Sequence, residues 1–259
     1  MKDCSSLKDN SMVENYGNDS TSDEGKLYSF FKKIETIEPF FVRRIPIWKR
    51  GLDIFGSCIG LVVFTPLFLV VAALIKIVSP GPVFFKQTRI GYGAKEFNFW
   101  KFRTMKVNAD TTSHQKYLCE LINEEYEEGE ECPKPMVKQD KQNLNIIPFG
   151  HFLRNSCIDE LPQLINVLLG DMSLVGPRPP IPYEVEEYLI WHKGRFDGLP
   201  GMTGLWQVSG KNRLTFKEMI RLDIQYERQM SLLTDIKILL MTPLAILNEY
   251  RCNRQDTFS

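Results

Sequence analysis

The sequence predicts a mostly helical α+β protein: a re-entrant membrane helix hairpin followed by a small cytoplasmic domain with a short β-hairpin and amphipathic interfacial helices. Three observations support this fold class. Residues 54–75 contain no charge. Two short aromatic stretches flank the Gly-Tyr-Gly sequence at 91–93. Amphipathic segments follow at 215–230 and 233–247.

Composition and charge are those of an ordinary globular protein, with 43% hydrophobic residues, 25% charged residues and a formal net charge of zero. The charge is unevenly spread, because residues 42–106 are strongly basic and residues 107–147 are acidic. We expect no nucleic-acid partner. The six cysteines lack CxxC spacing, which predicts free thiols in a reducing compartment and no zinc site.

The chain begins with a polar stretch, residues 1–40, that lacks the apolar core of a signal peptide and is predicted to be disordered. Within it, residues 27–41 form a short amphipathic segment that ends in two phenylalanines and precedes several basic residues. An interfacial segment on an anionic membrane surface has this pattern, and so does a surface helix of a soluble domain.

The apolar run at 54–75 would extend about 33 Å as a helix, which is enough to cross a membrane. Pro66 interrupts the run, and Thr65 is placed to satisfy a carbonyl that the proline leaves without a donor. A spanning helix should carry basic residues mainly at one end, whereas this run is flanked by them at both ends. These features predict a re-entrant hairpin broken at Thr65-Pro66, with Asp53 near the lipid headgroups.

A β-hairpin is expected next. Ser79-Pro80-Gly81-Pro82 should end the membrane helix, and residues 83–85 and 97–100 read as strands. Lys101 and Arg103 follow the second strand. These two side chains either clamp phosphate or form a solvated basic face.

Several later segments have predictions of their own. Residues 107–145 are a variable, partly acidic insert to which we assign no chemistry. Arg154 is a candidate partner for carboxylate or phosphate, or else it makes a surface salt bridge. Residues 183–196 are expected to be a helix, and the glycine-rich stretch 200–210 would let Trp206-Gln207 face a base or sugar. Helices are also expected at 215–230 and at 233–247, the latter resting on the bilayer.

Residues 156–180 carry the densest set of reactive groups. Asp159 and Glu160 open an apolar helix that Gly170 ends, and Pro177-Arg178-Pro179 follows. A helix N-terminus favours an ionised carboxylate and attracts phosphate. The alternative is structural, because Ser156 followed by Asp159 also fits a capping box.

This run, together with LysPheArgThrMet at 101–105, SerProGlyProValPhePhe at 79–85 and ProGlyMetThrGlyLeuTrpGlnValSerGly at 200–210, resembles the bacterial sugar transferases. More narrowly, it resembles the monotopic polyprenyl-phosphate phosphoglycosyl transferases of the undecaprenyl-phosphate galactose/glucose phosphotransferase type. The resemblance covers residues 48–247 except the insert. It implies a re-entrant helix with its break at a pair like Thr65-Pro66, and the first membrane step of exopolysaccharide, capsule or O-antigen synthesis.

The resemblance also implies roles. Asp159 would attack the β-phosphate of a UDP-sugar, UMP would leave, and the sugar phosphate would pass to polyprenyl phosphate, with Glu160 as the partner of Asp159. Attack on an anionic diphosphate requires a divalent cation and basic clamps. Mg²⁺ suits this oxygen site, with Asp159 as a ligand. Pro177-Arg178-Pro179 would present a stiff arginine fork to phosphate.

Three positions depart from the family pattern: Cys157-Ile158, Leu199 and Lys211. The family has an arginine at the position of Leu199, and Arg195 and Arg213 are the candidates to replace it.

The predicted organisation is a polar tail at 1–40, an interfacial segment and re-entrant helix at 41–78, a catalytic domain at 79–247 and a tail at 248–259. This places the protein on the cytoplasmic face of the cell inner membrane, and the sequence leaves a homodimer open. Two functions remain: the enzyme, or a catalytically degenerate membrane-attached scaffold of a polysaccharide pathway. An ordinary glycosyltransferase has no support, because the chain lacks an Asp-x-Asp pair.

Overall fold

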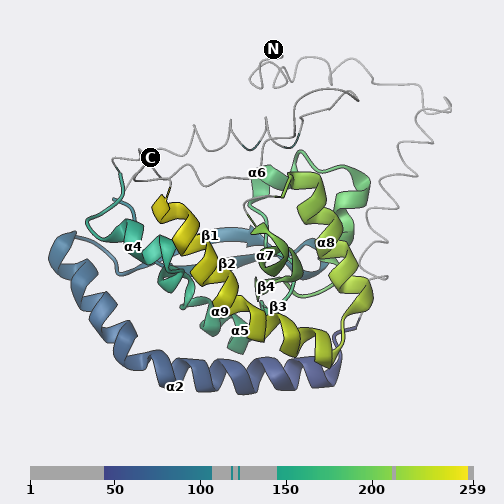
Figure 1. Ribbon diagram of the computed structural model, residues 1–259, viewed down its shortest axis with the longest axis horizontal. Helices are drawn as coiled ribbons and strands as arrows, with labels where there is room; N and C mark the ends of the chain where they lie inside the picture. The colour runs from purple at the N-terminus through teal and green to yellow at the C-terminus, as the bar shows by residue number, and fades with distance from the viewer. Residues whose placement is uncertain (1–43, 107–117, 119–121, 123–144, 212–213, 256–259) are drawn as a thin grey trace, which may run out of the picture. The chain divides into compact units, whose positions relative to one another are not determined.

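The computed structural model describes residues 44–106, 118, 122, 145–211 and 214–255. The predicted polar tail, the amphipathic segment at 27–41, most of the insert and Arg213 lie outside the described residues. Residues 44–259 form one compact unit. Its described part is mostly helical, with one long apolar helix and two small two-stranded sheets (Figure 1).

The long helix α2 spans Ile47–Val78 and includes Pro66. Figure 1 shows α2 bent along its length. The Thr65 hydroxyl donates to the Leu61 carbonyl at 2.6 Å. That carbonyl is the neighbour of the Val62 carbonyl, which Pro66 leaves without its helical donor. The helix ends before Ser79, and Gly81 takes a positive φ of 118°, as the Ser-Pro-Gly-Pro sequence predicts.

The polar and apolar faces of α2 are reversed relative to those of a helix in a water-soluble protein. Lys49, Asp53 and Ser57 lie one turn apart and are buried. A row of large apolar side chains is exposed instead: Ile54, Phe55, Ile59, Val62, Val63, Phe64, Leu69, Val70, Leu74 and Ile77. Among the described residues, α2 is the one helix long and apolar enough to cross a membrane.

The beginning of α2 is attached to the rest of the unit by buried charges. Lys49 Nζ donates to the Val175 carbonyl at 2.8 Å and to Asp235 Oδ2 at 2.7 Å. Asp53 Oδ1 accepts from Ser173 Oγ and from the Leu174 amide, each at 2.8 Å. The Asp53 carboxylate is therefore a buried acceptor for the strand β3 (Ser173–Val175), and its predicted position near the headgroups stays a prediction.

The end of α2 is attached mainly by apolar packing. Val71 and Ile75 are buried in a cluster whose other buried members are Phe102, Ile147 and Leu153. Both ends of α2 therefore contact the same compact unit.

The β-hairpin consists of β1 (Phe84–Ile90) and β2 (Glu96–Phe102), which pair antiparallel from Phe84–Phe102 to Ile90–Glu96. The strands are longer than the sequence suggested, and the short 3-10 turn η4 (Tyr92–Ala94) joins them with Gly93 at φ 62°. The hairpin prediction is confirmed.

A second sheet, absent from the sequence predictions, pairs β3 (Ser173–Val175) with β4 (Gly201–Thr203) in parallel. The glycine-rich stretch thus contains a strand and then helix α7 (Leu205–Ser209). A Cβ atom on Gly201 would lie 2.0 Å from the Gly176 amide nitrogen, so only glycine permits the backbone at residue 201 to come this close to the backbone at residue 176.

The predicted helix at Asp159 begins differently. Helix α4 (Gly150–Asn155) is followed by the 3-10 turn η5 (Ile158–Glu160) and then by α5 (Gln163–Leu169). Cys157 takes a left-handed conformation with φ 57°, which separates α4 from η5. Gly170, at φ 99°, ends α5 as predicted.

The prediction of a single helix at 183–196 is wrong, because the structure has two separate elements there. Helix α6 covers only Pro182–Val185, and the 3-10 helix η6 covers Ile190–Phe196. Leu189 is extended between them, with its amide bonded to His192 Nδ1 at 3.2 Å. This side chain offers the backbone an alternative to the helical hydrogen bond.

The last two predicted helices are present. Helix α8 (Phe216–Gln229) starts with a capping box, in which Thr215 and Glu218 exchange hydrogen bonds. Helix α9 spans Leu232–Gln255 and is longer than predicted.

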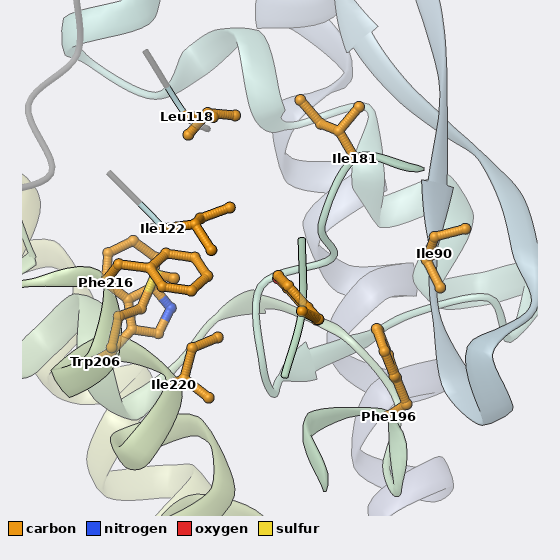
Figure 2. Close-up of a cluster of buried hydrophobic side chains, with 10 residues drawn as sticks. Ile90, Leu118, Ile122, Ile181, Phe196, Trp206, Phe216 and Ile220 are labelled. Atoms are coloured by element: carbon orange, nitrogen blue, oxygen red, sulfur yellow. The ribbon is translucent and has the colours of Figure 1, made fainter. Parts of the chain in front are cut away.

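The largest buried apolar cluster of the described residues includes two residues of the insert, Leu118 and Ile122. Figure 2 shows Ile122 beside Phe216 in this cluster. Trp206 belongs to the same cluster and is therefore a buried core residue. The complete set of buried members is Ile90, Leu118, Ile122, Ile181, Tyr188, Phe196, Trp206, Phe216, Met219 and Ile220.

Candidate active site

The carboxylate pair lies beside a lysine from the β-hairpin. Asp159 is buried and Glu160 is half-buried, both on η5. Lys101 Nζ, at the end of β2, lies 2.7 Å from Glu160 Oε1 and 3.9 Å from Asp159 Oδ2. The structure therefore brings together three residues that the sequence singled out as a nucleophile, its partner and a clamp.

The backbone before the pair does not form the capping box that the sequence allowed. Ser156 Oγ donates to the carbonyls of Phe152 and Leu153, at 2.7 and 3.2 Å, so it belongs to the end of α4. The residue before η5 is Cys157, whose side chain caps no amide. Asp159 thus sits in a short turn whose geometry is set by the left-handed Cys157.

Two further cations act on the pair electrostatically. Arg89, on β1, is buried, and the pKa of its guanidinium is lowered to about 10, mainly by burial and also by the positive charge of Arg178. Glu184 and Glu160 act on this pKa in the opposite direction. Arg89 therefore lies near both Arg178 and Glu160, which is an arrangement suited to an anion.

Lys211 is the second of these cations, and the sequence noted it only as a departure from the family pattern. Burial tends to lower the pKa of its ammonium group. Cys157 and Glu249 outweigh burial and raise this pKa, and Glu160 acts in the same direction. The Lys211 ammonium is paired with the Glu249 carboxylate. The lysine from the end of the glycine-rich stretch therefore lies close enough to the pair to act on it.

Arg178 stands in the Pro-Arg-Pro turn that follows β3. Its side chain is half-buried, and within the described part of the chain its guanidinium makes no hydrogen bond or ion pair. Its backbone carbonyl, in contrast, accepts a hydrogen bond from Arg195 Nη2 at 2.8 Å. Pro177 and Pro179 flank it and are both buried.

Arg103 and Arg195 make contacts that hold the fold. Arg103 is buried and donates to the carbonyls of Ser79 and Pro80 at 2.6 and 2.8 Å, so it holds the end of α2. Arg195, a proposed substitute for the arginine missing at 199, is bonded to Asp223 at 2.5 Å. Both guanidinium groups are occupied by protein acceptors, so neither is placed as a phosphate clamp in this structure. Leu199 itself is buried.

For two other residues, Arg154 and Gln207, the role in binding substrate stays a prediction. Arg154 lies half-buried on α4, the helix that leads into η5. Gln207 lies on α7, and its Oε1 is buried without a hydrogen-bond partner among the described residues. A buried acceptor of this kind is costly unless a ligand or water satisfies it. Thr65 and Pro66 lie in the long apolar helix α2, away from the carboxylate pair in sequence.

The donor set fits a magnesium ion. Mg²⁺ prefers oxygen ligands, keeps several waters and usually takes only one or two protein carboxylates. Asp159 and Glu160 are adjacent carboxylates in a short turn, which meets this requirement. No group of three His, Cys, Asp or Glu side chains gathers within the described ranges, so a closed all-protein site has no support there.

A buried carboxylate beside a lysine, with further cationic side chains near its neighbour Glu160, is suited to an anionic substrate. The unit that carries this site also carries a long exposed apolar helix. The chain belongs to the bacterial sugar transferase family, whose model matches residues 44–249.

Three relatives illustrate the similarity. The galactosyl transferase CpsE of Streptococcus agalactiae is 40% identical over 78% of this chain and 42% of its own length. The exopolysaccharide production protein ExoY of Sinorhizobium fredii is 36% identical over 76% of this chain and 84% of its own length. The UDP-glucose:undecaprenyl-phosphate glucose-1-phosphate transferase of Xanthomonas campestris is 39% identical over 74% of this chain and 37% of its own length. The chain therefore spans most of ExoY but less than half of the other two.

Proposed function

We propose that this protein transfers a sugar 1-phosphate from a UDP-sugar to polyprenyl (undecaprenyl) phosphate, giving polyprenyl-diphosphate-sugar and UMP. The observation that carries this proposal is the buried Asp159 carboxylate, set beside Lys101 and Glu160. The names of the relatives support the substrates, because several are called undecaprenyl-phosphate glucose or galactose phosphotransferases. The reaction would be the first membrane step in exopolysaccharide, capsule or O-antigen synthesis.

In the proposed first step, an Asp159 carboxylate oxygen attacks the β-phosphorus of the UDP-sugar. The bond from this phosphorus to the bridging oxygen breaks, and UMP leaves with that oxygen. The sugar phosphate is then attached to Asp159 as an acyl phosphate. In the second step an oxygen of polyprenyl phosphate attacks the same phosphorus, which forms the diphosphate and frees the carboxylate.

The surrounding cations make this attack feasible. A carboxylate and a diphosphate repel each other, so positive charge must neutralise the phosphate oxygens. Arg178 has an open guanidinium for this purpose, with Arg89 and Lys101 nearby. A Mg²⁺ ion held by Asp159, with Glu160 beside it, would supply further neutralisation. Glu160, bonded to Lys101, would orient the lysine and assist proton transfer.

The contacts of α2 support the predicted re-entrant hairpin. Lys49 at its start and Val71 and Ile75 near its end pack on the same unit. A straight helix that crossed the bilayer would place its two ends on opposite sides. The bend and the attachment of both ends therefore favour entry and exit on one face, which we propose to be the cytoplasmic face of the inner membrane.

Basic residues near the start of α2 give less support to this topology, because two of them contact the protein itself. Arg50 donates to the carbonyls of Val167 and Leu168 at the end of α5, at 2.6 and 2.8 Å. Lys49 is buried in its contact with Asp235. These two cations hold the fold together, so they are not available to mark a membrane leaflet.

Helix α9 carries a second exposed apolar row, formed by Leu233, Ile236, Leu240, Leu244 and Leu247. Leaving a large apolar side chain in water costs roughly 1.5–3 kcal/mol relative to burial. We propose that this row rests on the membrane surface, as the outer face of α2 enters it. The polyprenyl acceptor would then reach Asp159 from the lipid side.

Cysteine labelling tests the topology. Cysteines introduced at the exposed residues Arg44 and Pro82, in a variant with the native cysteines removed, should react with an impermeant reagent only from the cytoplasmic side. Reaction of one site from the periplasm would contradict the re-entrant helix. Pro66→Leu should straighten α2 and move one label across the membrane, whereas Leu67→Val serves as the matched control.

Mass spectrometry tests the chemistry and separates the enzyme from a degenerate scaffold. Wild-type protein given Mg²⁺ and a panel of UDP-sugars without acceptor should release UMP and gain the mass of one sugar phosphate. Peptide mapping should place the adduct on Asp159. A scaffold would release no UMP with any sugar, and an adduct on another residue would refute the assignment of the nucleophile.

A further inference from the structure

The Pro-Arg-Pro turn is fastened along its whole length. Four consecutive carbonyls, at residues 177–180, each accept a hydrogen bond from a different donor. The donors are the Gly201 amide to Pro177 at 2.8 Å, Arg195 Nη2 to Arg178 at 2.8 Å, Arg89 Nη1 to Pro179 at 2.9 Å and the Ile90 amide to Pro180 at 3.0 Å. Because prolines donate no backbone hydrogen bond, these carbonyl oxygens are the main backbone groups through which the rest of the protein can bind this turn.

Two of these four donors are buried arginine side chains, and Arg195 is the more constrained. Its Nη2 donates both to the Arg178 carbonyl and to Asp223 Oδ2 at 2.5 Å. Its Nη1 donates to Tyr188 Oη at 2.6 Å and lies 3.6 Å from Glu184 Oε1. A planar guanidinium bonded at both ends has a fixed orientation, which a lysine cannot reproduce.

The side chain of Arg178 has no comparable support. Within the described part of the chain its guanidinium makes no hydrogen bond or ion pair. Its direction is therefore set by its own backbone, and the backbone at this residue is held by Arg195. A displacement of about 1 Å in a group that positions substrate can reduce a rate by roughly 10²-fold.

We infer that Arg195 is a positioning residue, which fixes the backbone of Arg178 and so aims the Arg178 guanidinium at the diphosphate of the substrate. The inference rests on the proposed function, in which Arg178 contacts that diphosphate. Arg195 itself does not touch substrate. The buried acceptors Glu184, Tyr188 and Asp223 hold Arg195 in turn.

A double-mutant cycle tests this inference with UDP and Mg²⁺ as the probe, because UDP binds without being consumed. We expect Arg178→Lys to weaken UDP binding roughly tenfold or more, as charged hydrogen bonds contribute on this scale. Arg195→Lys should weaken binding by a similar factor. The double variant should be no more than about twofold weaker than Arg178→Lys alone, because residues that act through one another are not additive.

The matched control is Arg103→Lys. Arg103 is also a buried arginine that donates to two backbone carbonyls, but those of Ser79 and Pro80. Any effect of Arg103→Lys on UDP affinity should be the same with and without Arg178→Lys. Equal losses from Arg195→Lys in both backgrounds, or no loss in a folded protein, would overturn the positioning role.

Arg195→Lys is a buried substitution, so thermal unfolding of each variant is measured first. If it does not fold, Tyr188→Phe replaces it in the cycle, since this change removes only the hydroxyl that holds Arg195 Nη1. A wild-type protein that binds no UDP and releases no UMP would refute the proposed function. Additive losses in an active wild-type protein would refute only the role of Arg195.

Discussion

Two clusters of charged side chains flank the Pro-Arg-Pro turn and differ in how far the protein satisfies them. The carboxylate cluster comprises Lys101, Asp159 and Glu160; the arginine cluster comprises Glu184, Tyr188, Arg195 and Asp223. In the arginine cluster every residue is buried and Arg195 contacts all the others at 3.6 Å or less. In the carboxylate cluster Lys101 is 2.7 Å from Glu160 but 3.9 Å from Asp159, and the side chains of Lys101 and Glu160 are partly exposed.

The difference teaches that residue type alone does not mark a site. A buried charge is costly unless hydrogen bonds and an opposite charge satisfy it, and once satisfied it has nothing left for a ligand. The arginine cluster therefore supports the fold. The carboxylate cluster keeps the proposed nucleophile beside partly exposed charged side chains, which are groups that phosphate chemistry can use.

The largest effect is expected from Asp159→Asn. The amide keeps the shape of the side chain but cannot form the acyl phosphate, so turnover should be abolished with no large change in melting temperature. UMP release and the sugar-phosphate adduct should both disappear. Full activity in this variant would show that Asp159 is not the nucleophile.

Glu160→Gln is expected to slow the reaction by roughly 10² to 10⁴-fold, because positioning and proton transfer contribute on this scale. The adduct on Asp159 should still form, only more slowly. Single-turnover kinetics with a UDP-sugar checks this. A Glu160→Gln enzyme as fast as the wild type would leave Glu160 with a structural contact to Lys101 alone.

Substitutions in the arginine cluster should change the stability of the fold more than the rate of the reaction. Removing one partner of a buried ion pair costs about 3–5 kcal/mol, so Asp223→Ala should lower the free energy of unfolding by this order. Denaturant titration of the solubilised protein measures the change. The control is Glu186→Ala, an exposed acid in the same region, which should change the stability by no more than about 0.5 kcal/mol.

The smallest effect concerns His192, which packs against this cluster. Burial lowers the pKa of its imidazole to about 4, and the positive charges of Arg195 and Lys217 act in the same direction. The unfolded chain has a histidine pKa of about 6.5, so between the two values it binds more protons than the folded chain. Lowering the pH through this window should therefore destabilise the wild type more than His192→Gln. Parallel pH profiles of unfolding for the two proteins would refute this sign.

Much of the fold follows from local sequence. The apolar run predicted α2, Gly170 predicted the end of α5, and the amphipathic pattern of residues 215–230 predicted α8. The adjacent Asp159 and Glu160 could also be read directly, because no folding is needed to bring neighbours together. These signals succeed where the physical cause lies within a few residues of the feature.

Other features depend on contacts between distant residues. Lys101 meets Glu160 across 59 positions, and Lys49 meets Asp235 across 186. From the sequence, Arg103 and Arg195 are candidates for binding phosphate. A basic residue near a motif has the same sequence signature whether or not its guanidinium is bonded to acceptors of the protein. Only tertiary packing decides which acceptors reach it.

The sequence by itself therefore determined the family, the long apolar helix and the carboxylate pair. The tertiary structure decided which cations surround the pair, that both ends of α2 rest on one unit, and that the Pro-Arg-Pro turn is held at four carbonyls. The physical reason is that propensities, caps and apolar periodicity act over one or two helical turns. The satisfaction of a buried charge depends on whichever groups the whole chain brings within about 3 Å.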